Sequence, residues 1–351
     1  MRNLFVCHSQ IQLVLAVGLA KGRFIDDKND LILFQDFNMA DDTKSILLST
    51  FSRVLFRAGI YPAVNTTWKA KLKRYPDDLN SIKAFMAQPY SRVFEVCDGN
   101  IPEIFILKRA YHLNKDTEMI WLEDGSHPYY LNIDAKDGLN SNGLTRNLRK
   151  IFFKYFFRLG KFYDFEFNDM GGSRYLTKAY ITLKGKERDI FRSKEIVEIT
   201  TEEYKRGINT LFKPTGIEIE DNSIILALDK LDVYQDISTI KSLVLNIKSS
   251  VKNKKVYYKY HPREESVLEG LENFTQLNKN LGIEYYYSAS MNKNITVIGV
   301  KSTGLQSSKV LGFHTISAIK IVNEEDPVVV GFYKNIGVIL PLTIDELLLE
   351  L

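Results

Sequence analysis

The sequence holds only two cysteines among its 351 residues, and it has no long apolar run. Cys7 and Cys97 each end a short apolar, strand-like segment, where a buried thiol behaves as a small hydrophobic side chain. A disulfide framework is therefore not expected. No run approaches the roughly 18 to 20 apolar residues that cross a bilayer, and the N-terminus turns polar too early for a secretory signal. We therefore expect a cytoplasmic protein, with contact to the inner face of a membrane as a further expectation.

Signatures of a bound metal are missing as well. The sequence has no Asp-x-Asp string and no group of His and Cys residues at the spacing of metal ligands. Internal repeats and low-complexity segments are not evident. We therefore expect a globular protein that works without a metal and without a bound cofactor.

What the sequence does contain is an alternation of strand-like and helix-like segments. Its 351 residues and 45% hydrophobic content suffice for two cores, which predicts two domains. In the first half, the segments alternate in the order expected of an α/β domain whose parallel sheet is covered by helices on both faces. We expect strands over residues 3–7, 31–34, 93–96 and 119–122, and helices over residues 11–20, 43–58, 79–85 and 101–114.

The pattern weakens between Tyr163 and Pro214, and we place the crossover between domains there. The first domain is then residues 1–200 and the second residues 210–330, with residues 330–351 packing back on the first. A last helix over residues 344–351 has Thr343 as its N-cap. In the second domain we expect strands over residues 223–228, 256–260, 283–286, 295–300 and 318–322, and helices over residues 237–249, 264–274 and 304–310.

Positive charge is clustered, although the net charge is only +4. Lys69 and Lys71 belong to a first cluster. In a second cluster, Arg146, Lys150 and Lys154 recur every fourth residue among phenylalanines and tyrosines, which predicts a basic, aromatic, amphipathic helix. Such a helix fits a solvated charged face over an aromatic core, a polyanionic acceptor, or the headgroups of a membrane surface.

Two acidic side chains stand where a strand is expected to end. Glu123, Asp124 and Gly125 come directly after the apolar run of residues 119–122. In open α/β sheets, ligands bind beyond the carboxyl ends of the strands, and Gly125 lets the chain turn sharply there. A carboxylate at this place is suited to act as a general base, although an Asp-Gly pair is also an ordinary turn.

An imidazole and two hydroxyls follow strands in the second half. His261 comes after the strand over residues 256–260, and Pro262 disfavours helix at His261, which holds the imidazole at the strand end. A histidine there can bind and protonate a phosphate. Residues 301–304, which read Lys-Ser-Thr-Gly, precede a helix whose N-terminus either forms an anion site or is simply capped.

Together these strings resemble the bacterial sialyltransferases and capsular polysialyltransferases. Those enzymes move sialic acid from CMP-sialic acid and carry an acidic D/E-D/E-G motif, an H-P motif and a downstream serine/threonine motif. The opening residues 3–13 are also similar to the first strand and helix of lipooligosaccharide sialyltransferases. The three motifs occur here in order, as Glu123-Asp124-Gly125, His261-Pro262 and Ser302-Thr303.

The resemblance implies a GT-B fold, in which two Rossmann-like domains face each other across a cleft. It implies an inverting, metal-independent reaction, in which Glu123 takes the proton of the acceptor and His261 binds the phosphate of the departing CMP. The C-terminal domain would hold CMP-sialic acid and the N-terminal domain the acceptor, while Asp124 is assigned to structure. The donor-binding residues implied are His261, Pro262, Ser302, Thr303 and Gly304.

The clustered positive charge indicates the kind of acceptor. A polyanionic chain lying along a basic groove gains many weak contacts, which favours elongation of capsular polysialic acid. A terminal lipooligosaccharide sialyltransferase acting on galactose is the alternative, in which the basic helix would contact a membrane or a capsule-assembly complex. The acceptor-binding residues expected are Lys69, Lys71, Arg146, Lys150 and Lys154.

Two other classes of protein stay open. A GT-B transferase for another nucleotide sugar would share the fold and a phosphate site. A non-catalytic polyanion-binding module would explain the basic helix but would leave Glu123 and His261 without a role. Because carboxylates beside a groove oppose phosphate binding, we expect no nucleic-acid partner.

Overall fold

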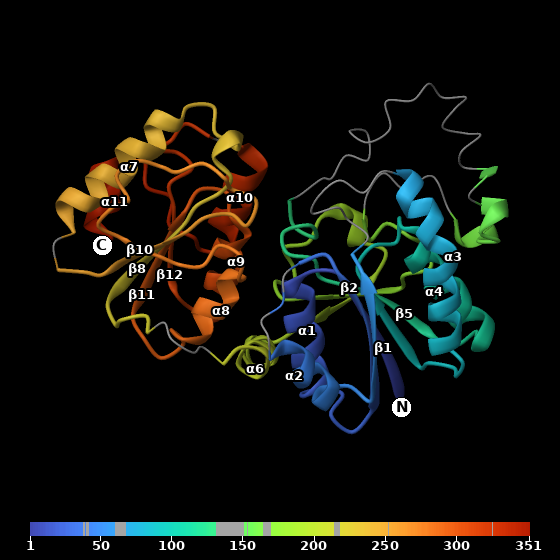
Figure 1. Ribbon diagram of the computed structural model, residues 1–351. Coiled ribbons are helices and arrows are strands. Elements are labelled where there is room, and N and C mark those ends of the chain that lie inside the picture. Colours follow the sequence, from blue (N-terminus) through green and yellow to red (C-terminus); the bar gives the residue numbers. More distant parts are fainter. Residues whose placement is uncertain are drawn as a thin grey trace. The chain divides into compact units, whose positions relative to one another are not determined.

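The computed structural model describes residues 1–37, 39, 42–59, 68–130, 151–152, 154–163, 170–213, 218–251, 253–324 and 326–351, without the side chains of residues 68–72. The chain divides into two compact units, Met1–Leu211 and Phe212–Leu351. Each unit has a parallel sheet with helices packed on it (Figure 1). None of the helices in these described ranges combines the length and the apolar character of a membrane span.

The first unit is built on a parallel sheet that, among the described residues, has seven strands in the order β3-β2-β1-β4-β5-β6-β7. Helices α1 and α2 lie on one side of this sheet, and α3 and α4 lie on the other (Figure 1). The strands are β1 Arg2–Cys7, β2 Lys28–Gln35, β3 Arg53–Ala58, β4 Arg92–Glu95, β5 Glu118–Leu122, β6 Lys178–Ile181 and β7 Glu195–Glu198. The helices are α1 Gln10–Ala20, α2 Thr43–Thr50, α3 Trp68–Phe85, α4 Ile101–Leu113 and α6 Thr201–Leu211, with short 3₁₀ turns η1 Gly160–Phe162 and η2 Asp189–Phe191.

The order of the strands reverses direction at β1, whose neighbours are β2 and β4. This is the strand order of a doubly wound domain, and ligands of such domains bind beyond the carboxyl ends of the strands at the point of reversal. The turn from β1 into α1 is fixed there by a capping box, in which Ser9 Oγ accepts from Gln12 N and the Gln12 side chain accepts from Ser9 N. The sheet therefore directs the β1–α1 turn and the end of β4 to one place.

Helices α1 and α6 touch through two glycines. A Cβ atom on Gly18 of α1 would stand 2.1 Å from Glu203 O, and one on Gly207 of α6 would stand 2.0 Å from Val14 O. Both atoms are backbone carbonyl oxygens, which cannot give way by a side-chain rotation. The two backbones can therefore approach this closely only because both positions lack a side chain.

We expect Gly18→Ala to destabilise the protein by about 1–3 kcal/mol or more, since the helices must separate to admit the methyl group. The free energy of unfolding in urea measures this. Gly331→Ala is the matched control, because Gly331 also lies inside a helix and nothing lies within 4 Å of its Cβ position. There the gain in helix propensity, about 1 kcal/mol, should stabilise the chain. Equal stability of Gly18→Ala and the wild type would show that α1 and α6 do not meet in this way.

The second unit repeats the same topology on a smaller scale. In the part of the chain that the structure describes, its parallel sheet has five strands in the order β10-β9-β8-β11-β12, so the reversal falls between β8 and β11. Helix α11 packs on α7 within this unit, which contains residues 330–351. The strands are β8 Ser223–Ala227, β9 Val256–Lys259, β10 Thr275–Gln276, β11 Ile295–Gly299 and β12 His314–Ser317. The helices are α7 Ile237–Ser250, α8 Ile283–Ser288, α9 Thr303–Leu311, α10 Pro327–Asn335 and α11 Ile344–Leu349, with a 3₁₀ turn η3 Leu231–Val233.

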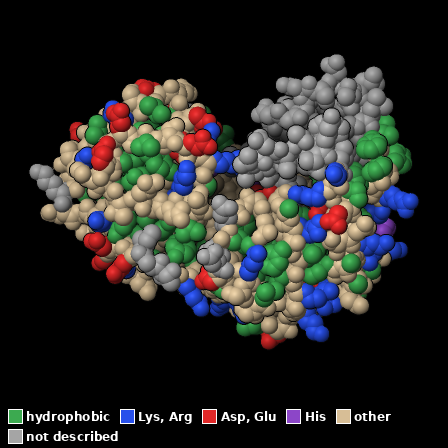
Figure 2. Space-filling view, viewed as in Figure 1, with side chains coloured by type: hydrophobic (Ala, Val, Ile, Leu, Met, Phe, Trp, Pro, Cys, Tyr) green, Lys and Arg blue, Asp and Glu red, His purple; other side chains and the backbone are tan. Residues whose placement is uncertain are grey.

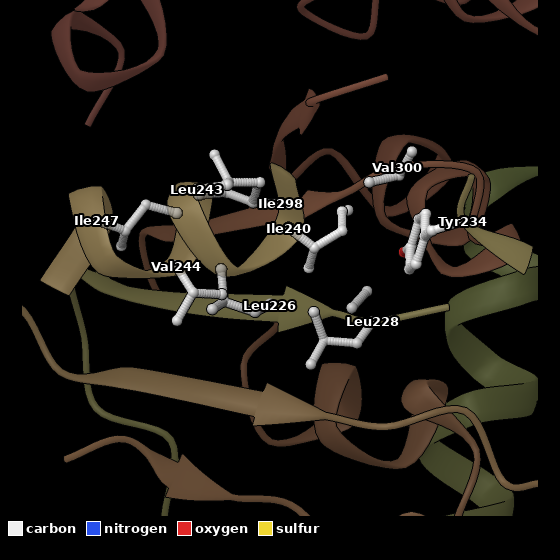
Figure 3. A pocket seen from close by; sticks show the side chains of 11 residues that line it. Leu226, Leu228, Tyr234, Ile240, Leu243, Val244, Ile247, Ile298 and Val300 are labelled. Carbon is white, nitrogen blue, oxygen red and sulfur yellow. The ribbon is translucent and has the colours of Figure 1, made fainter. Parts of the chain in front are cut away.

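A small cavity of about 20 Å³ lies between α7 and the strands β8 and β11 (Figure 3). Aliphatic side chains of the helix, such as Ile240 and Val244, face Leu226 and Ile298 of the strands across it. A cavity with so few polar groups in its lining stays dry, because a buried water needs several polar partners. We therefore assign this cavity to the core and not to ligand binding.

Several predicted elements of the first unit are corrected by the structure. Residues 43–58 form α2 and then β3 instead of one helix, because Phe51 is extended (φ −103°, ψ 143°) and the run from Arg53 pairs with β2. The helix predicted over residues 79–85 is only the last part of α3, which continues through Pro76. The segment between Tyr163 and Pro214, in which we placed the domain crossover, contains β6, β7 and α6, which were not predicted, and the boundary between the two units falls within it, after Leu211.

Three predictions in the second unit are also wrong. Residues 264–274 form turns instead of a helix, since Gly270 has φ +97° and its N–H donates to the Glu272 side chain (2.9 Å). Such local bonds from side chain to backbone compete with helical ones. Residues 283–286 begin helix α8 instead of a strand, and the last strand is β12, which precedes the predicted range 318–322.

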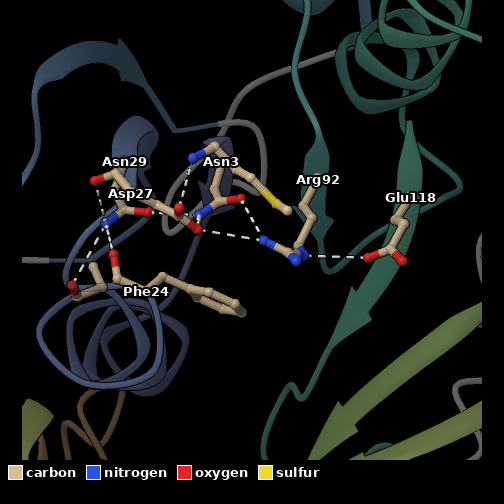
Figure 4. Close-up of polar contacts among 8 residues, drawn as sticks. Asn3, Phe24, Asp27, Asn29, Arg92 and Glu118 are labelled. Carbon is tan, nitrogen blue, oxygen red and sulfur yellow. Dashed lines mark hydrogen bonds and ion pairs between the residues drawn. The ribbon is translucent and has the colours of Figure 1, made fainter. Parts of the chain in front are cut away.

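The amino edge of the first sheet is closed by side-chain hydrogen bonds (Figure 4). Asn3 Nδ2 donates to Asn29 Oδ1 (2.8 Å) and to Asp27 Oδ2 (3.1 Å), and Asn29 Nδ2 donates to Phe24 O (2.8 Å). Arg92 joins the cluster through Asn3 Oδ1 (3.4 Å). These bonds satisfy the buried amides of Asn3 and Asn29, while Asp27 and Arg92 are half-buried, which marks this edge as structural.

Candidate active site

The carboxyl edge of the first sheet carries titratable and hydroxyl side chains after most of its strands. They come from segments far apart in the sequence, and the parallel sheet brings them to one edge. In the sheet order they are Asp36 after β2, His8 and Ser9 after β1, Glu95 at the end of β4, Glu123 and Asp124 after β5, and Thr182 after β6.

Glu123, the predicted base, is only 2% exposed. Its Oε2 accepts hydrogen bonds from Tyr129 Oη (2.6 Å), from Thr182 N and from Thr182 Oγ1 (2.9 Å), while Oε1 accepts from Thr182 Oγ1 (2.9 Å). Burial raises the pKa of Glu123 to about 7, although the bonds from Tyr129 and Thr182 oppose that rise. A carboxylate with such a pKa can accept a proton near neutral pH.

Asp124 is the more exposed of the two carboxylates, being half-buried where Glu123 is buried. Ser9 Oγ, at the N-cap of α1, donates to Asp124 Oδ1 (3.4 Å). The positive end of a helix dipole also favours a carboxylate at this position. The contact with Ser9 supports the structural role expected of Asp124. Because Asp124 is more exposed than Glu123, it is also the alternative candidate for the general base.

His8 joins three elements at the switch point of the first sheet. Its Nδ1 lies 3.0 Å from Asp36 Oδ2, its Nε2 lies 3.0 Å from Glu103 Oε1, and its ring stacks on Phe34. Burial alone would lower the pKa of His8, but the charges and hydrogen bonds of Glu103 and Asp36 raise it to about 9. The imidazolium is therefore the form present at neutral pH, and it neutralises two buried carboxylates.

Glu95 differs from these groups because no described residue donates a hydrogen bond to its carboxylate. It is fully buried, and neither of its oxygens has a hydrogen-bond partner among the described residues. Burial raises the pKa of Glu95 well above its ordinary value, and the negative charges of Glu103 and Asp98 raise it further. The folded state therefore favours the protonated form.

We expect Glu95 to make the protein less stable as the pH rises. Because the folded pKa of Glu95 is raised, its stabilising contribution is fully present below its ordinary pKa of 4.5 and is lost as the pH rises through the folded value. Glu95→Gln cannot ionise at this position. When the pH is raised from about 5 to about 8, the free energy of unfolding of the wild type should therefore fall by at least about 1 kcal/mol more than that of Glu95→Gln.

Urea unfolding of both proteins at the two pH values measures this difference. Glu202→Gln is the control, since the Glu202 side chain is 79% exposed and should leave the wild-type pH dependence unchanged. If Glu95→Gln followed the wild type as well, Glu95 would not be the buried acid that the structure places at the end of β4.

The predicted donor-binding residues of the second unit gather at the carboxyl edge of its sheet. His261 follows β9 and Ser302 follows β11, and both strands pair with β8 between them. Lys230 follows β8, and Lys301 precedes Ser302. Lys230 forms an ion pair with Asp232, and Lys301 Nζ lies 3.2 Å from Glu324 Oε2, so carboxylates balance the charge of both lysines. The edge lies at a switch point, which is where such sheets bind ligands.

His261 is exposed, and its ring has a defined hydrogen-bonding role. Arg263 N donates to His261 Nδ1 (3.2 Å), which leaves the proton of the neutral imidazole on Nε2. Partial burial lowers the pKa of His261, and the positive charges of Arg263 and Lys259 lower it further. At neutral pH His261 is therefore a neutral ring whose Nε2–H can donate to a phosphate oxygen. Pro262 beside it is exposed as well.

Ser302 is the N-cap of α9, so the capping interpretation of this string is confirmed. Its Oγ accepts from Gly304 N (3.2 Å), which commits the Gly304 amide, and Gly304 itself is buried. Thr303 is exposed in the first turn of α9. Asp229, after β8, accepts from Lys301 N (2.9 Å) and fixes this loop. A phosphate at the α9 N-terminus would therefore meet Thr303 and the hydroxyl hydrogen of Ser302 first.

Most of the predicted acceptor-binding residues lie outside what the structure describes. Arg146 and Lys150 fall outside the described residues, and the side chains of Lys69 and Lys71 in α3 are not described. Lys154 is half-buried in a helical segment whose Tyr155 and Phe156 are 70% and 60% exposed. Figure 2 shows lysine and arginine side chains gathered over α3 and α4 in the same unit.

Sequence reasoning missed several residues of the two edges. Tyr129 and Thr182, which hold Glu123, were not singled out, because β6 was not predicted and the pairing of β5 with β6 is not visible in the sequence. His8 and Asp229 are not among the predicted site residues either. The signal that could have found His8, Thr182 and Asp229 is the same for each, namely a polar residue directly behind an apolar strand.

Among the described residues, no three His, Cys, Asp or Glu side chains are grouped as ligands of a metal ion would be. The independence from metal stays a prediction.

The sequence matches no protein-family model and none of the curated proteins with which it was compared. Solved structures do match. The α/β-galactoside α-2,3-sialyltransferase of the luminous marine bacterium Photobacterium phosphoreum has a TM-score of 0.60 and 12% identity, covering 97% of this chain and 98% of that one. A putative UDP-N-acetylglucosamine 2-epimerase of Listeria monocytogenes has a TM-score of 0.58 and 10% identity, covering 99% and 86%.

The UDP-GlcNAc 2-epimerase of Methanocaldococcus jannaschii also matches, with a TM-score of 0.55 and 12% identity over 100% of this chain and 91% of that one. At such identities the matches establish the fold alone. The expected α/β architecture with two parallel sheets is confirmed, and the fold is GT-B-like, as in this sialyltransferase and these two epimerases.

Proposed function

We propose that this chain is a glycosyltransferase that moves sialic acid from CMP-sialic acid to a glycan acceptor. The observation that carries the proposal is the placement of its three motifs. Glu123, His261 and Ser302 each stand behind a strand of a Rossmann-type parallel sheet, at the edge where such sheets bind ligands. The match over nearly the whole length of a sialyltransferase supports the same reading.

In the proposed reaction the acceptor hydroxyl attacks the anomeric carbon of sialic acid in a single inverting displacement. The new bond joins the acceptor oxygen to that carbon, the bond from the carbon to the phosphate oxygen breaks, and its electron pair leaves with CMP. Glu123 takes the proton of the hydroxyl, for which its pKa of about 7 is suited.

The donor phosphate would bind at the edge of the second sheet. His261 Nε2–H donates to a phosphate oxygen, and the Thr303 and Ser302 hydroxyls donate at the N-terminus of α9. Lys230 and Lys301 lie at the same edge, and a phosphate would compete with Asp232 and Glu324 for them. These hydrogen-bond donors stabilise the negative charge that develops on the leaving phosphate. The carboxylate of sialic acid is part of the transferred sugar and does not leave with CMP.

The acceptor is proposed from the clustered positive charge. We assign the chain to the elongation of an anionic oligosialic acid, bound by the basic residues of the first unit, and take a terminal galactoside as the alternative acceptor. Because the Photobacterium phosphoreum enzyme is named for galactosides, the galactoside has its own support.

A second candidate is epimerisation at C2 of UDP-N-acetylglucosamine. The matches with two 2-epimerases, with TM-scores of 0.58 and 0.55, favour it. It would use the same edges for a different nucleotide sugar. The strings His261-Pro262 and Glu123-Asp124-Gly125 favour sialyl transfer over this candidate.

One set of assays separates these proposals. Release of CMP from CMP-sialic acid is measured with oligosialic acid and with a lactose-type galactoside, and products are resolved by chromatography. A ladder on oligosialic acid supports chain elongation, and a single addition to lactose supports the terminal transferase. Formation of UDP-N-acetylmannosamine from UDP-N-acetylglucosamine, with no CMP release, would replace the proposal with epimerisation.

A further inference from the structure

The loop after β5 folds back on the residue that begins it. Gly125 has φ +52°, a left-handed conformation that turns the chain out of the strand. Tyr129 N then donates to Ser126 O (3.1 Å), and the Tyr129 side chain returns to the strand end, where it is 5% exposed. Its hydroxyl reaches Glu123 Oε2 at 2.6 Å.

The neighbouring strand completes this enclosure. Glu123 N donates to Tyr180 O (3.0 Å), so the ladder between β5 and β6 continues to Glu123, and Thr182 follows directly. Thr182 N and Oγ1 both donate to the Glu123 carboxylate. Leu183 N donates to Tyr129 Oη (3.0 Å), which orients the tyrosine hydroxyl so that its own hydrogen points to Glu123.

We infer that Tyr129 and Thr182 are positioning residues that hold the Glu123 carboxylate in the orientation in which it takes the proton of the acceptor. Three described donors reach the carboxylate: Tyr129 Oη and Thr182 N bind Oε2, and the one hydroxyl hydrogen of Thr182 is shared between Oε2 and Oε1, both 2.9 Å from Oγ1. A carboxylate held by donors from two segments of the chain keeps its orientation while it exchanges a proton. This inference rests on the proposed role of Glu123 as the base.

The same contacts set the pH range in which Glu123 is ionised. Burial favours the protonated carboxyl, the negative charge of Asp124 favours it further, and the donors Tyr129 and Thr182 favour the carboxylate. Burial and the neighbouring carboxylate also raise the pKa of Tyr129 well above its usual range, so it remains a donor. Arg188 lies in the adjoining loop, where its Nε donates to His127 O (2.9 Å).

Tyr129→Phe removes one donor to the carboxylate without removing the ring. The pKa of Glu123 should then rise, and the acidic limb of kcat/KM for CMP release should move to higher pH by about one unit. At pH values below the limb, the variant should be about tenfold less active than the wild type. On the plateau at high pH, the two should be equally active. Thr182→Val, which keeps the backbone donor and loses Oγ1, should shift the limb in the same direction.

Tyr175→Phe is the matched control, since its hydroxyl donates to Lys161 O (3.0 Å) in the same unit and away from Glu123. Its pH profile should coincide with that of the wild type. If Tyr129→Phe lowered activity by the same factor at every pH, its role would be structural only and the inference would be overturned.

A second readout separates failure of this inference from failure of the proposed function. The side-chain carboxyl carbons of glutamate are labelled with ¹³C, and the signal absent in Glu123→Gln identifies Glu123. Its titration should move to higher pH in Tyr129→Phe whether or not CMP is released. An unchanged titration would overturn the inference, whereas an inactive wild type with the shifted titration would overturn the proposed function and leave the positioning contacts established.

Discussion

Glu123→Gln is expected to lower kcat for sialyl transfer by about 10²- to 10⁴-fold, because an amide cannot take the proton of the acceptor hydroxyl. The affinity for CMP should stay within a factor of two or so, since the proposed phosphate contacts belong to the second unit. Release of CMP under saturating donor measures the first quantity, and calorimetric titration with CMP measures the second. A loss of CMP binding in this variant would count against the assigned role.

Asp124→Asn is the control for that experiment, because the two carboxylates are adjacent and differ in their contacts. Asp124 is half-buried and bonded to Ser9, and Glu123 is buried and bonded to Tyr129 and Thr182. We expect Asp124→Asn to keep most of the activity. The reverse pattern, with Asp124→Asn inactive and Glu123→Gln active, would make the more exposed carboxylate the base. Thermal unfolding of both variants checks that the fold is intact.

His261→Ala is expected to lower kcat/KM for the donor by about 10²- to 10³-fold and to weaken CMP binding as well. The reason is the loss of the Nε2–H donor, which Arg263 N holds in place through its bond to Nδ1. Because the donor binds the phosphate in the ground state and binds it more strongly as negative charge develops in the transition state, the effect should appear in KM and in kcat. Steady-state CMP release and calorimetry with CMP measure the two parts.

His314→Ala supplies the matched control for His261. His314 begins β12 at the opposite, amino edge of the same sheet, and its side chain is 41% exposed beside Glu350. It should keep wild-type kinetics and CMP affinity. If both histidine variants behaved like the wild type, the donor phosphate would not lie at the carboxyl edge of β9.

The strands that sequence reasoning located correctly are those buried on both faces. β1, β5 and β11 are short apolar runs, and such runs need no knowledge of their neighbours to be recognised. The errors fall where local preference and tertiary context disagree. Residues 283–286 are rich in tyrosine, which is typical of a strand, but they begin α8. The helix predicted from residue 43 was extended too far and covered the residues of β3.

The candidate site divides in the same way. Glu123, His261 and Ser302 could be named from the sequence, because each follows a recognisable strand. The contacts that decide their chemistry could not, since Thr182 reaches Glu123 only through the pairing of β5 with β6, and Glu103 reaches His8 only through the packing of α4. Strand order is a long-range property, and a single sequence does not display it.

The two cysteines of the chain lie at this same edge, since Cys7 ends β1 and Cys97 follows β4. They are 0% and 4% exposed, and burial raises the pKa of the Cys7 thiol far above its usual range, so little reactive thiolate is present. A thiol reagent can therefore modify them only while these strand ends are open. The rate at which the two thiols of the wild-type chain are modified then measures how often this edge opens. A compound that binds at the edge should lower that rate.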